Sequence, residues 1–392
     1  MPTDTTGSPR PLPDRPNLRH LKAQARDLRL AGAATSVTDA QFQIARRYGF
    51  ASWPKLKAHV ESVGTDATCT KPLTAGALVS EITTFLAGQD LLTLAEIEHA
   101  LGRELEAAGP AALVQLHEKL IAGTDWDFYP ADPVAKRVHR VLADRLLEPG
   151  SALSGIEHVR AVAGRTVVMV ANHLSYADAN LLELLLQRSG GGALADRLTA
   201  IAGPKVYSSR KRRFSSLCFG TIRTPQSRAL STGDVPMSPR DLARAARRSI
   251  DVARARLRAG DVLLVFAEGT RSRTKEMQPV LAGVARYLDD PEAWVLPVGI
   301  VGTDAMFPIG EDGLHRVRID IRIGAPIQGR TLRQHAGADR RLMMDAAGLG
   351  IADLLPAEYR GYYGDRAIDL SAARRVLSGA RSTGTLNRDT QG

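Results

Sequence analysis

The chain has 392 residues, of which 44% are hydrophobic, so it is long enough to bury a sizeable core and to form two domains. No apolar run approaches the roughly eighteen residues that a membrane-spanning helix needs, and the proline-rich N-terminus lacks the apolar core of a secretory signal. The net charge of +10 favours anionic partners, but nucleic acid is not expected among them, because the basic residues form no recognisable binding module.

Composition and periodicity divide the chain into five parts. These are a disordered N-terminus at 1–17, a small helical unit at 18–63, a helical bundle at 75–150, an α/β domain at 151–375 and a disordered tail at 376–392. In the small unit, Asp39 is expected to cap the second helix, and Phe50 and Trp53 are expected to lie in the core. The two cysteines, Cys69 and Cys218, lack metal-type spacing and are expected to be reduced and structural.

An aromatic connection precedes the last helix of the expected bundle. Trp126, Phe128 and Tyr129 could be buried against the α/β domain, or they could dip into a membrane interface. Burial is the simpler expectation, and the residues alone leave both interpretations open.

One polar block follows an apolar, β-branched run at 166–170 and precedes a helical leucine pattern. It places His173 and Asp178 in the spacing N-H-x-x-x-x-D, at the point where a strand ends and a helix begins. A carboxylate beside an imidazole fixes its tautomer and stabilises the imidazolium, so the pair can act as a base. The alternative is a capping box, in which Ser175 and Asp178 only start the helix.

A second polar block follows another strand-like run, at 261–265. It reads Phe266-Ala267-Glu268-Gly269-Thr270-Arg271-Ser272-Arg273. Gly269 would let the backbone approach a ligand, and Arg271 and Arg273 offer planar forks that suit phosphate. An exposed charged turn is the alternative for this block alone. Two such strand ends in one domain favour a site.

Basic residues also gather in two helical segments. Seven arginines lie between Arg240 and Arg258, in a helix that Ser238 and Pro239 start and Gly260 ends. They could meet anionic headgroups, or they could form a solvated face. The second cluster, Arg210 to Arg213, could attract a phosphate.

The two blocks together resemble the glycerolipid acyltransferases of the 1-acyl-glycerol-3-phosphate acyltransferase type. Three later segments also resemble this family and follow its order: 295–300, with its proline at Pro297, 321–327 and 355–361. The similarity covers roughly residues 150–365. It implies a mixed α/β sheet flanked by helices, the glycerolipid acyltransferase fold, preceded by N-terminal helical regions.

This chain departs from the family pattern in ways that bear on the acceptor. Gly220 and Ile222 fit the family's second block, but Arg223 comes earlier than the usual arginine. Ala267 stands where the family often has proline. The segment around Lys205 is closer to the soluble glycerol-3-phosphate acyltransferases. These departures preserve the reaction class and leave the acceptor open.

The resemblance implies direct transfer of a fatty acyl group from acyl-CoA or acyl carrier protein to a glycerol phosphate hydroxyl, as in phospholipid biosynthesis. His173 would be the base and Asp178 its partner. The substrate would be held by Glu268, Gly269, Thr270, Arg271, Arg223, Lys205 and Pro297. No cofactor or metal is expected, since the thioester is a co-substrate.

The expected partners are an acyl thioester, a phosphorylated glycerol and an anionic membrane surface. The expected location is cytoplasmic, peripheral on the inner face of the cell membrane. Two alternatives stay open: an enzyme acting on free glycerol 3-phosphate, and a catalytically silent protein that binds lipid surfaces.

Overall fold

The computed structural model describes Leu12 and residues 18–66, 74–86, 94–121, 126–207, 210–225, 238–308, 314–337 and 339–383. Its contacts divide the chain into a small N-terminal unit and a large unit that begins at Leu73. Apart from Leu12, the expected disordered N-terminus lies outside the described residues.

The N-terminal unit is a set of three helices around its own core. They are α1 (Leu18–Leu30), α2 (Val37–Arg47) and α3 (Trp53–Asp66). Phe50 and Trp53, which were expected in the core, are half-buried and pack against it. The expected cap was wrong: Ser36 precedes α2, and its hydroxyl accepts from the Asp39 N–H at 3.0 Å. Asp39 lies in the first turn of the helix.

Three helices open the large unit: α4 (Ala75–Leu86), α5 (Leu94–Ile121) and α6 (Pro133–Leu146). Gly109 breaks α5 with φ 75°, directly before Pro110, because proline cannot continue the hydrogen-bonding of the preceding turn. Asp132 caps α6 through the backbone N–H groups of Val134 and Ala135. Asp132 also pairs with Lys119 at 2.7 Å, which fastens α5 to the start of α6.

The rest of the large unit is built on a mixed nine-stranded sheet flanked by helices, which confirms the expected fold class. The strand order is β1-β5-β4-β6-β3-β7-β8-β2, with β9 added against β7. The strands are β1 (Phe128–Tyr129), β2 (Ala152–Ser154), β3 (Val167–Ala171), β4 (Leu198–Ala202), β5 (Gly220–Arg223), β6 (Val262–Phe266), β7 (Trp294–Val301), β8 (Asp320–Ile323) and β9 (Ile327–Gln328).

Strand direction decides which ends meet. β5, β4, β6, β3 and β7 are parallel neighbours, whereas β1 runs antiparallel to β5 and β8 runs antiparallel to β7. All five residues of β3 are buried, because helices cover both faces of the sheet. The carboxyl ends of β3 and β6 are adjacent, since Ala171 is the register partner of Phe266.

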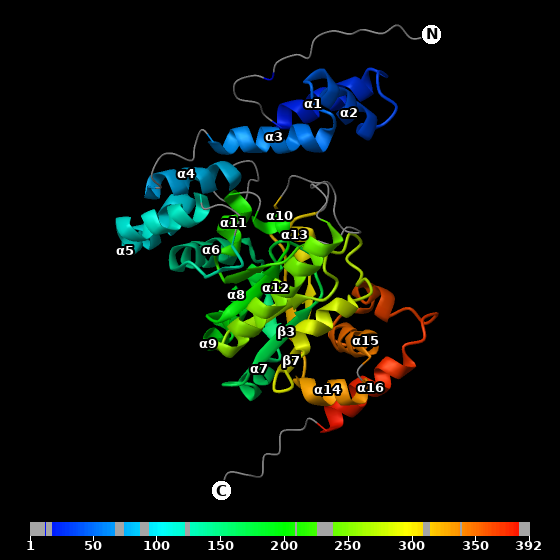
Figure 1. The fold of residues 1–392 in the computed structure, drawn as a ribbon. Helices are drawn as coiled ribbons and strands as arrows, with labels where there is room; N and C mark the ends of the chain where they lie inside the picture. The colour runs from blue at the N-terminus through cyan, green and yellow to red at the C-terminus, as the bar shows by residue number, and fades with distance from the viewer. Residues whose placement is uncertain are drawn as a thin grey trace. The chain divides into compact units, whose positions relative to one another are not determined.

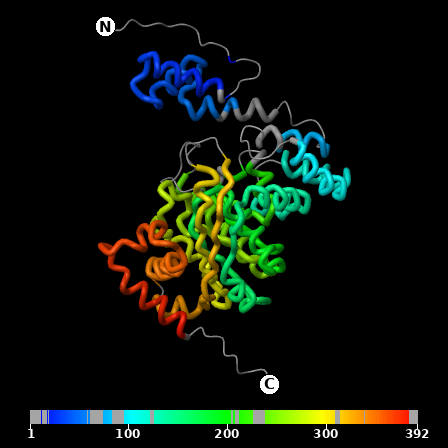
Figure 2. The backbone as a smooth tube through the Cα atoms, turned by 180° about the vertical axis from the view of Figure 1, so that it is seen from behind, coloured from blue at the N-terminus to red at the C-terminus, as the bar shows by residue number. Residues whose placement is uncertain are grey.

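Helices and short 3₁₀ turns connect the strands. They are α7 (Ile156–Ala161), α8 (Asp178–Arg188), α9 (Gly192–Ala195), α10 (Pro204–Tyr207), α11 (Arg210–Ser216), α12 (Pro239–Arg258), η2 (Ala282–Leu288), α13 (Thr303–Met306), α14 (Gly329–His335), α15 (Arg340–Ala352), η3 (Ala357–Tyr359), η4 (Gly361–Tyr363) and α16 (Ser371–Thr383). In both views α6 and α8 lie on one side of the sheet, and α15 and α16 on the other (Figure 1 and Figure 2).

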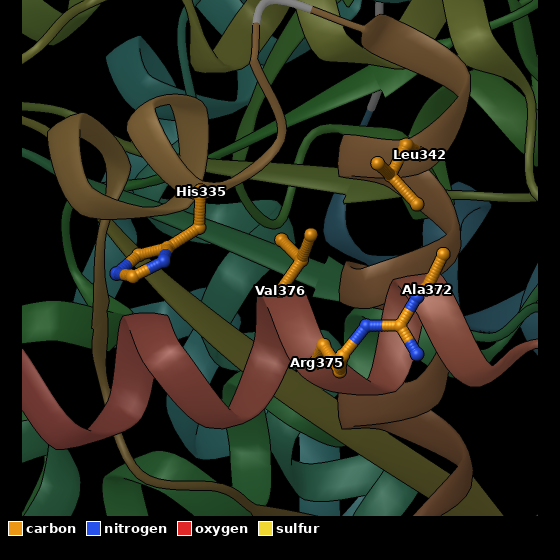
Figure 3. Close-up of a pocket in the computed structure, with 5 residues that line it drawn as sticks. All are labelled: His335, Leu342, Ala372, Arg375 and Val376. Carbon is orange, nitrogen blue, oxygen red and sulfur yellow. The ribbon is translucent and has the colours of Figure 1, made fainter.

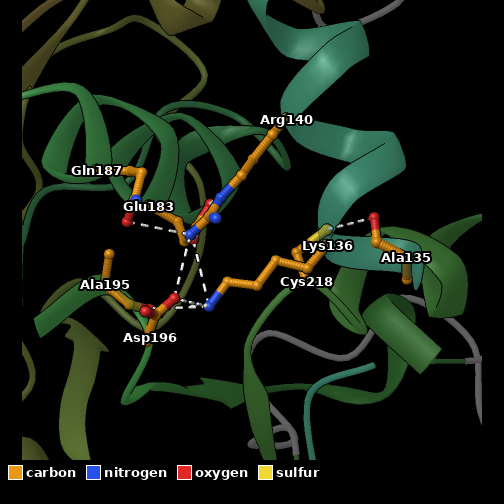
Figure 4. Close-up of polar contacts among 8 residues, drawn as sticks. All are labelled: Ala135, Lys136, Arg140, Glu183, Gln187, Ala195, Asp196 and Cys218. Atoms are coloured by element: carbon orange, nitrogen blue, oxygen red, sulfur yellow. Dashed lines mark hydrogen bonds and ion pairs between the residues drawn. The ribbon is translucent and has the colours of Figure 1, made fainter. Parts of the chain in front are cut away.

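A buried carboxylate ties α6 to α8. Glu183, 2% exposed, accepts from the Arg140 guanidinium and lies 3.4 Å from the Lys136 ammonium (Figure 4). Lys136 and Arg140 also reach Asp196, just after α9. Cys218 is buried beside this group, and burial raises the pKa of its thiol well above the usual value. A structural role for Cys218 fits this environment; Cys69 lies outside the described residues.

The structure can be compared with three further sequence expectations: the ends of α12, the aromatic connection and the C-terminal tail. Ser238 and Pro239 start α12, and Gly260 follows its end with φ 92°, as expected. The aromatic connection is held in the fold, because Phe128 and Tyr129 pair with β5 and Trp126 packs on Tyr129. The expected tail boundary falls inside α16, where Val376, Leu377 and Ala380 are buried; residues 384–392 lie outside the described range.

Candidate active site

The two polar blocks form one site at the carboxyl edge of the sheet. His173 follows β3 by two residues, and its Nδ1 lies 2.8 Å from Oδ2 of Asp178. The imidazole stacks on Phe266, with ring centroids 4.0 Å apart and planes 17° apart. Since a carboxylate oxygen accepts, Nδ1 carries the proton and Nε2 of neutral His173 is left as the accepting nitrogen.

Asp178 is fully buried and is held by several donors. Its Oδ2 accepts from the backbone N–H groups of Leu174 and Ser175, at 2.8 and 3.0 Å. Its Oδ1 accepts from the Thr303 hydroxyl at 2.5 Å. Asp178 therefore pairs with the His173 imidazole and also accepts from the Ser175 backbone, so the two interpretations of the sequence do not exclude each other. Ser175 itself does not cap α8: Ala177 precedes the helix, and the Ser175 hydroxyl accepts from its N–H.

Thr303 reaches Asp178 because the chain reverses sharply after β7. Gly302 has φ 93°, and a Cβ there would lie 2.3 Å from the Arg318 carbonyl oxygen. Only glycine fits such a turn without backbone movement. The turn delivers the fully buried Thr303 hydroxyl to the carboxylate from 125 residues away in sequence.

Glu268 joins the two blocks. Its Oε1 accepts from the His173 N–H at 2.9 Å, and its Oε2 accepts from the Gln278 N–H at 2.8 Å. The Ser272 N–H donates in turn to the His173 carbonyl at 2.7 Å. Both carboxylate oxygens thus bind backbone, so Glu268 positions the histidine loop. The sequence did not suggest this task, and the expected contact of Glu268 with substrate stays a prediction.

Burial raises the pKa of Glu268 to about 7, against the lowering effect of its two backbone hydrogen bonds. The folded protein therefore holds this proton more tightly than the unfolded chain, and Glu268 lowers the stability as the pH rises from 4.5 to about 7.

Relative to Glu268→Gln, the free energy of unfolding of the wild type should fall across this interval by on the order of 3 kcal/mol. Because glutamine does not titrate, the stability of the variant reports the pH dependence of all other titratable groups. It is therefore the reference for the wild type. Urea unfolding at pH 4.5, 6 and 8 measures the difference. Parallel stability curves for the two proteins would contradict the raised pKa.

The second block supplies the basic side of the site. Gly269 has φ 66°, which accounts for glycine in the turn after β6. Thr270 follows it, and the Arg271 guanidinium carbon lies 3.8 Å from the centre of the Tyr176 ring. Tyr176 belongs to the histidine loop. No carboxylate among the described residues pairs with Arg271.

Two further expected residues follow the next parallel strands. Arg223 ends β5, with its guanidinium 5.7 Å from the Tyr207 ring centre. Lys205 lies in α10, directly after β4, and its side chain is outside the described part of the molecule. The carboxyl ends of β3, β6, β4 and β5 therefore all carry expected site residues.

Two expectations fall outside this cluster. Pro297 is buried in the middle of β7, opposite Val170, and it packs close to Gly350 of α15 and Gly324. This is a core position, so no described contact places Pro297 at a substrate wall.

Arg213 is also buried, and its two terminal nitrogens donate to the carbonyls of Leu120 and Tyr207 at 3.1 Å. The cluster 210–213 is therefore not one exposed basic surface.

Sequence reasoning missed the contributions of Thr303, Asn172, Phe266 and Tyr176. Asn172 is fully buried and exchanges hydrogen bonds with the backbone of Ile300, which locks the end of β3 to β7. Asn172 and Phe266 lie next to the motif residues in the sequence, so their position could have marked them as part of the site. No local signal linked Thr303 to Asp178.

A separate hollow of about 220 Å³ lies between α14, α15 and α16. It is lined by His335, Leu342, Ala372, Arg375 and Val376 (Figure 3). None of these residues belongs to either block. Across the described ranges, no group of three or more His, Cys, Asp or Glu residues could hold a metal ion.

The family-model comparison covers both blocks. Residues 151–301 match the family model described as Acyltransferase. A solved structure, the 1-acyl-sn-glycerophosphate (LPA) acyltransferase PlsC from Thermotoga maritima, is 18% identical with a TM-score of 0.40, covering 71% of this chain and 95% of that one. No curated protein matches the sequence.

The α/β sheet with a histidine–carboxylate pair at its carboxyl edge, together with the family model, defines residues 151–301 as an acyltransferase domain. The N-H-x-x-x-x-D and E-G-T-R-S blocks both lie within the residues that this family model matches.

Proposed function

We propose that the protein transfers a fatty acyl group from a thioester to the hydroxyl of a phosphorylated glycerol, with 1-acyl-glycerol 3-phosphate as the preferred acceptor. The observation that carries this proposal is the His173–Asp178 pair, held beside Arg271 at one edge of the sheet. A base and a phosphate-type cation are the two elements that such an acceptor needs.

In the proposed mechanism, Nε2 of His173 takes the proton from the acceptor hydroxyl as its oxygen attacks the thioester carbonyl. Asp178 holds the imidazole and stabilises its charged form. The imidazolium then returns the proton to the thiolate that leaves. Among the described residues, no serine or cysteine side chain forms a hydrogen bond with the His173 imidazole, which favours direct transfer.

The test is turnover with labelled acyl thioesters and a panel of acceptors. The panel contains 1-acyl-glycerol 3-phosphate, free glycerol 3-phosphate and monoacylglycerol, each with acyl-CoA and with acyl carrier protein as donor. Product identification separates the two phosphorylated acceptors and the two donors. No transfer to any acceptor, together with retained vesicle binding, would support the catalytically silent alternative and overturn this proposal.

The proposed location is peripheral on an anionic membrane surface, on the cytoplasmic side. Within the described ranges, no helix has both the length and the apolar character needed to cross a bilayer. On α12, Arg248, Arg254 and Arg256 pair with carboxylates. Four other arginines of that helix are exposed and pair with no carboxylate among the described residues: Arg240, Arg244, Arg247 and Arg258.

Replacing those four arginines by glutamine should weaken binding to anionic vesicles, because each contributes roughly 1 kcal/mol near such a surface. Binding should also fall as salt rises and be weak on neutral vesicles. Vesicle sedimentation measures both effects. Arg330→Gln is the control, since Arg330 is exposed but paired with Glu292. Attachment that salt does not change would contradict a charge-based surface.

A further inference from the structure

The segment around 355–361, one of the three later segments that resemble the family, has no role in the proposed mechanism. It contains the short 3₁₀ turns η3 (Ala357–Tyr359) and η4 (Gly361–Tyr363), and it lies beyond residues 151–301, which the family model matches. The fold brings it back to the site, where it contacts both loops that support the histidine–carboxylate pair.

The first contact is made by the Tyr359 side chain. Tyr359 is buried, and its hydroxyl donates to Oδ1 of Asp304 at 3.1 Å. Burial and the neighbouring Asp304 carboxylate raise the pKa of Tyr359 to about 12, so the hydroxyl keeps its proton near neutral pH and remains a donor. Asp304 directly follows Thr303, whose hydroxyl donates to Asp178. Tyr359 therefore holds the turn that presents Thr303 to Asp178.

The second contact is made by the backbone of the same segment. The Tyr359 carbonyl accepts from the Met277 N–H at 2.9 Å, and the Tyr362 N–H donates to the Met277 carbonyl at 3.0 Å. Gly361 has φ 45°, and a Cβ there would lie 2.4 Å from the Met277 carbonyl oxygen. Only glycine lets the two backbones approach so closely. The loop after β6 is therefore fixed at Met277.

Met277 is one residue from the support of the histidine loop. The Gln278 N–H donates to Glu268, and Glu268 accepts from the His173 N–H. The segment therefore supports Asp178 through the turn after β7 and His173 through the loop after β6. The imidazole and the carboxylate must keep their distance of 2.8 Å if the carboxylate is to direct the base. A displacement of about 1 Å at a reacting group can lower the rate by on the order of 10²-fold.

We propose that Tyr359 is a positioning residue for acyl transfer, because its hydroxyl and its carbonyl hold the two loops that support Asp178 and His173. Among the described residues, no hydrogen bond joins Tyr359 directly to either member of the pair. It acts through Thr303 on one side and through Met277 on the other. This inference rests on the proposed function and adds to it a residue outside the matched domain.

Steady-state kinetics of Tyr359→Phe test this role. The variant keeps the ring and the carbonyl and loses the hydroxyl bond to Asp304. We expect kcat to fall by about 10-fold, with KM for the thioester and for the acceptor unchanged. Tyr287→Phe is the matched control, because the Tyr287 hydroxyl bonds to the Ser249 hydroxyl at 3.0 Å and belongs to neither block. An unchanged kcat in Tyr359→Phe, or an equal loss in Tyr287→Phe, would overturn the proposal.

A double-mutant cycle separates positioning from a general loss of stability. If Tyr359 acts through Thr303, adding Tyr359→Phe to Thr303→Val should lower kcat by no more than about 2-fold, because the path to Asp178 is already broken. Effects on unconnected parts of the fold would instead multiply, and that outcome would contradict the positioning role. Circular dichroism melting checks that the single variants and the double variant fold.

A second readout does not depend on turnover. In protein with isotope-labelled histidine, the imidazole nitrogen shifts of His173, assigned by their loss in His173→Ala, report its tautomer and its titration. They should change in Tyr359→Phe and stay the same in Tyr287→Phe. If the wild type transfers nothing to any acceptor, the proposed function fails. The nitrogen shifts then still decide: unchanged shifts in Tyr359→Phe overturn the positioning role, and altered shifts support it.

Discussion

His173→Ala should lower the rate of acyl transfer by about 10²–10⁴-fold while the protein stays folded, since a positioned general base typically contributes this factor. The imidazole is the only group in the described site with an accepting nitrogen directed by a buried carboxylate. Its removal leaves Asp178 with its backbone donors and with the Thr303 hydroxyl, so the loop keeps its hydrogen bonds.

Single-turnover measurements with a labelled thioester would give the chemical rate without interference from product release. His158→Ala is the matched control, because His158 lies on α7 near an exposed carboxylate, Glu157. Circular dichroism melting checks that both variants fold. A folded His173→Ala protein with near-normal turnover would show that another group takes the proton.

Asp178→Asn should reduce turnover by a similar factor, about 10²–10⁴-fold, for a different reason. The asparagine amide can donate to Nδ1, which moves the imidazole proton to Nε2, the nitrogen that must accept. The charge that stabilises the imidazolium is also lost. The fold should tolerate this change, because the amide oxygen can still accept from the Thr303 hydroxyl and from the Ser175 N–H.

Thr303 gives this prediction a graded companion. Thr303→Val removes the hydroxyl donor at nearly constant volume, so it should lower turnover less than Asp178→Asn, and Thr303→Ser should restore it. pH–rate profiles of the variants would report whether the base itself is altered. Asp178→Asn protein that folds and keeps turnover within a few-fold of the wild type would rule out the proposed role of this carboxylate.

The order of elements and the two strand ends were predictable because local chemistry specifies them. The run Val167–Ala171 is apolar and β-branched, and Asn172 to Asp178 is abruptly polar, so a buried strand had to end beside the polar block. The same contrast marked Phe266 and Glu268. Ser238, Pro239 and Gly260 bounded α12 through capping chemistry that acts within a few residues.

Other features depended on contacts between distant segments. The packing of α11 against α5 decided that Arg213 is buried. The packing of α15 against β7 decided that Pro297 lies in the core and not at a substrate-binding surface. Glu268, which the sequence suggested as a substrate contact, binds the backbone N–H of His173 because β6 lies beside β3. Sequence periodicity specifies which face of one element is apolar, but it contains no information about which neighbour covers that face.

The sequence by itself determined which residue types stand at the ends of the buried strands: a histidine, a carboxylate and an arginine. The tertiary structure alone decided how they act together, through strand order. It placed β3 between β6 and β7, so that Glu268 holds the backbone of His173 and Thr303 holds Asp178 from opposite sides. Hydrogen bonds form only within about 3 Å, and the packed sheet brings residues 95 and 125 positions apart to that distance.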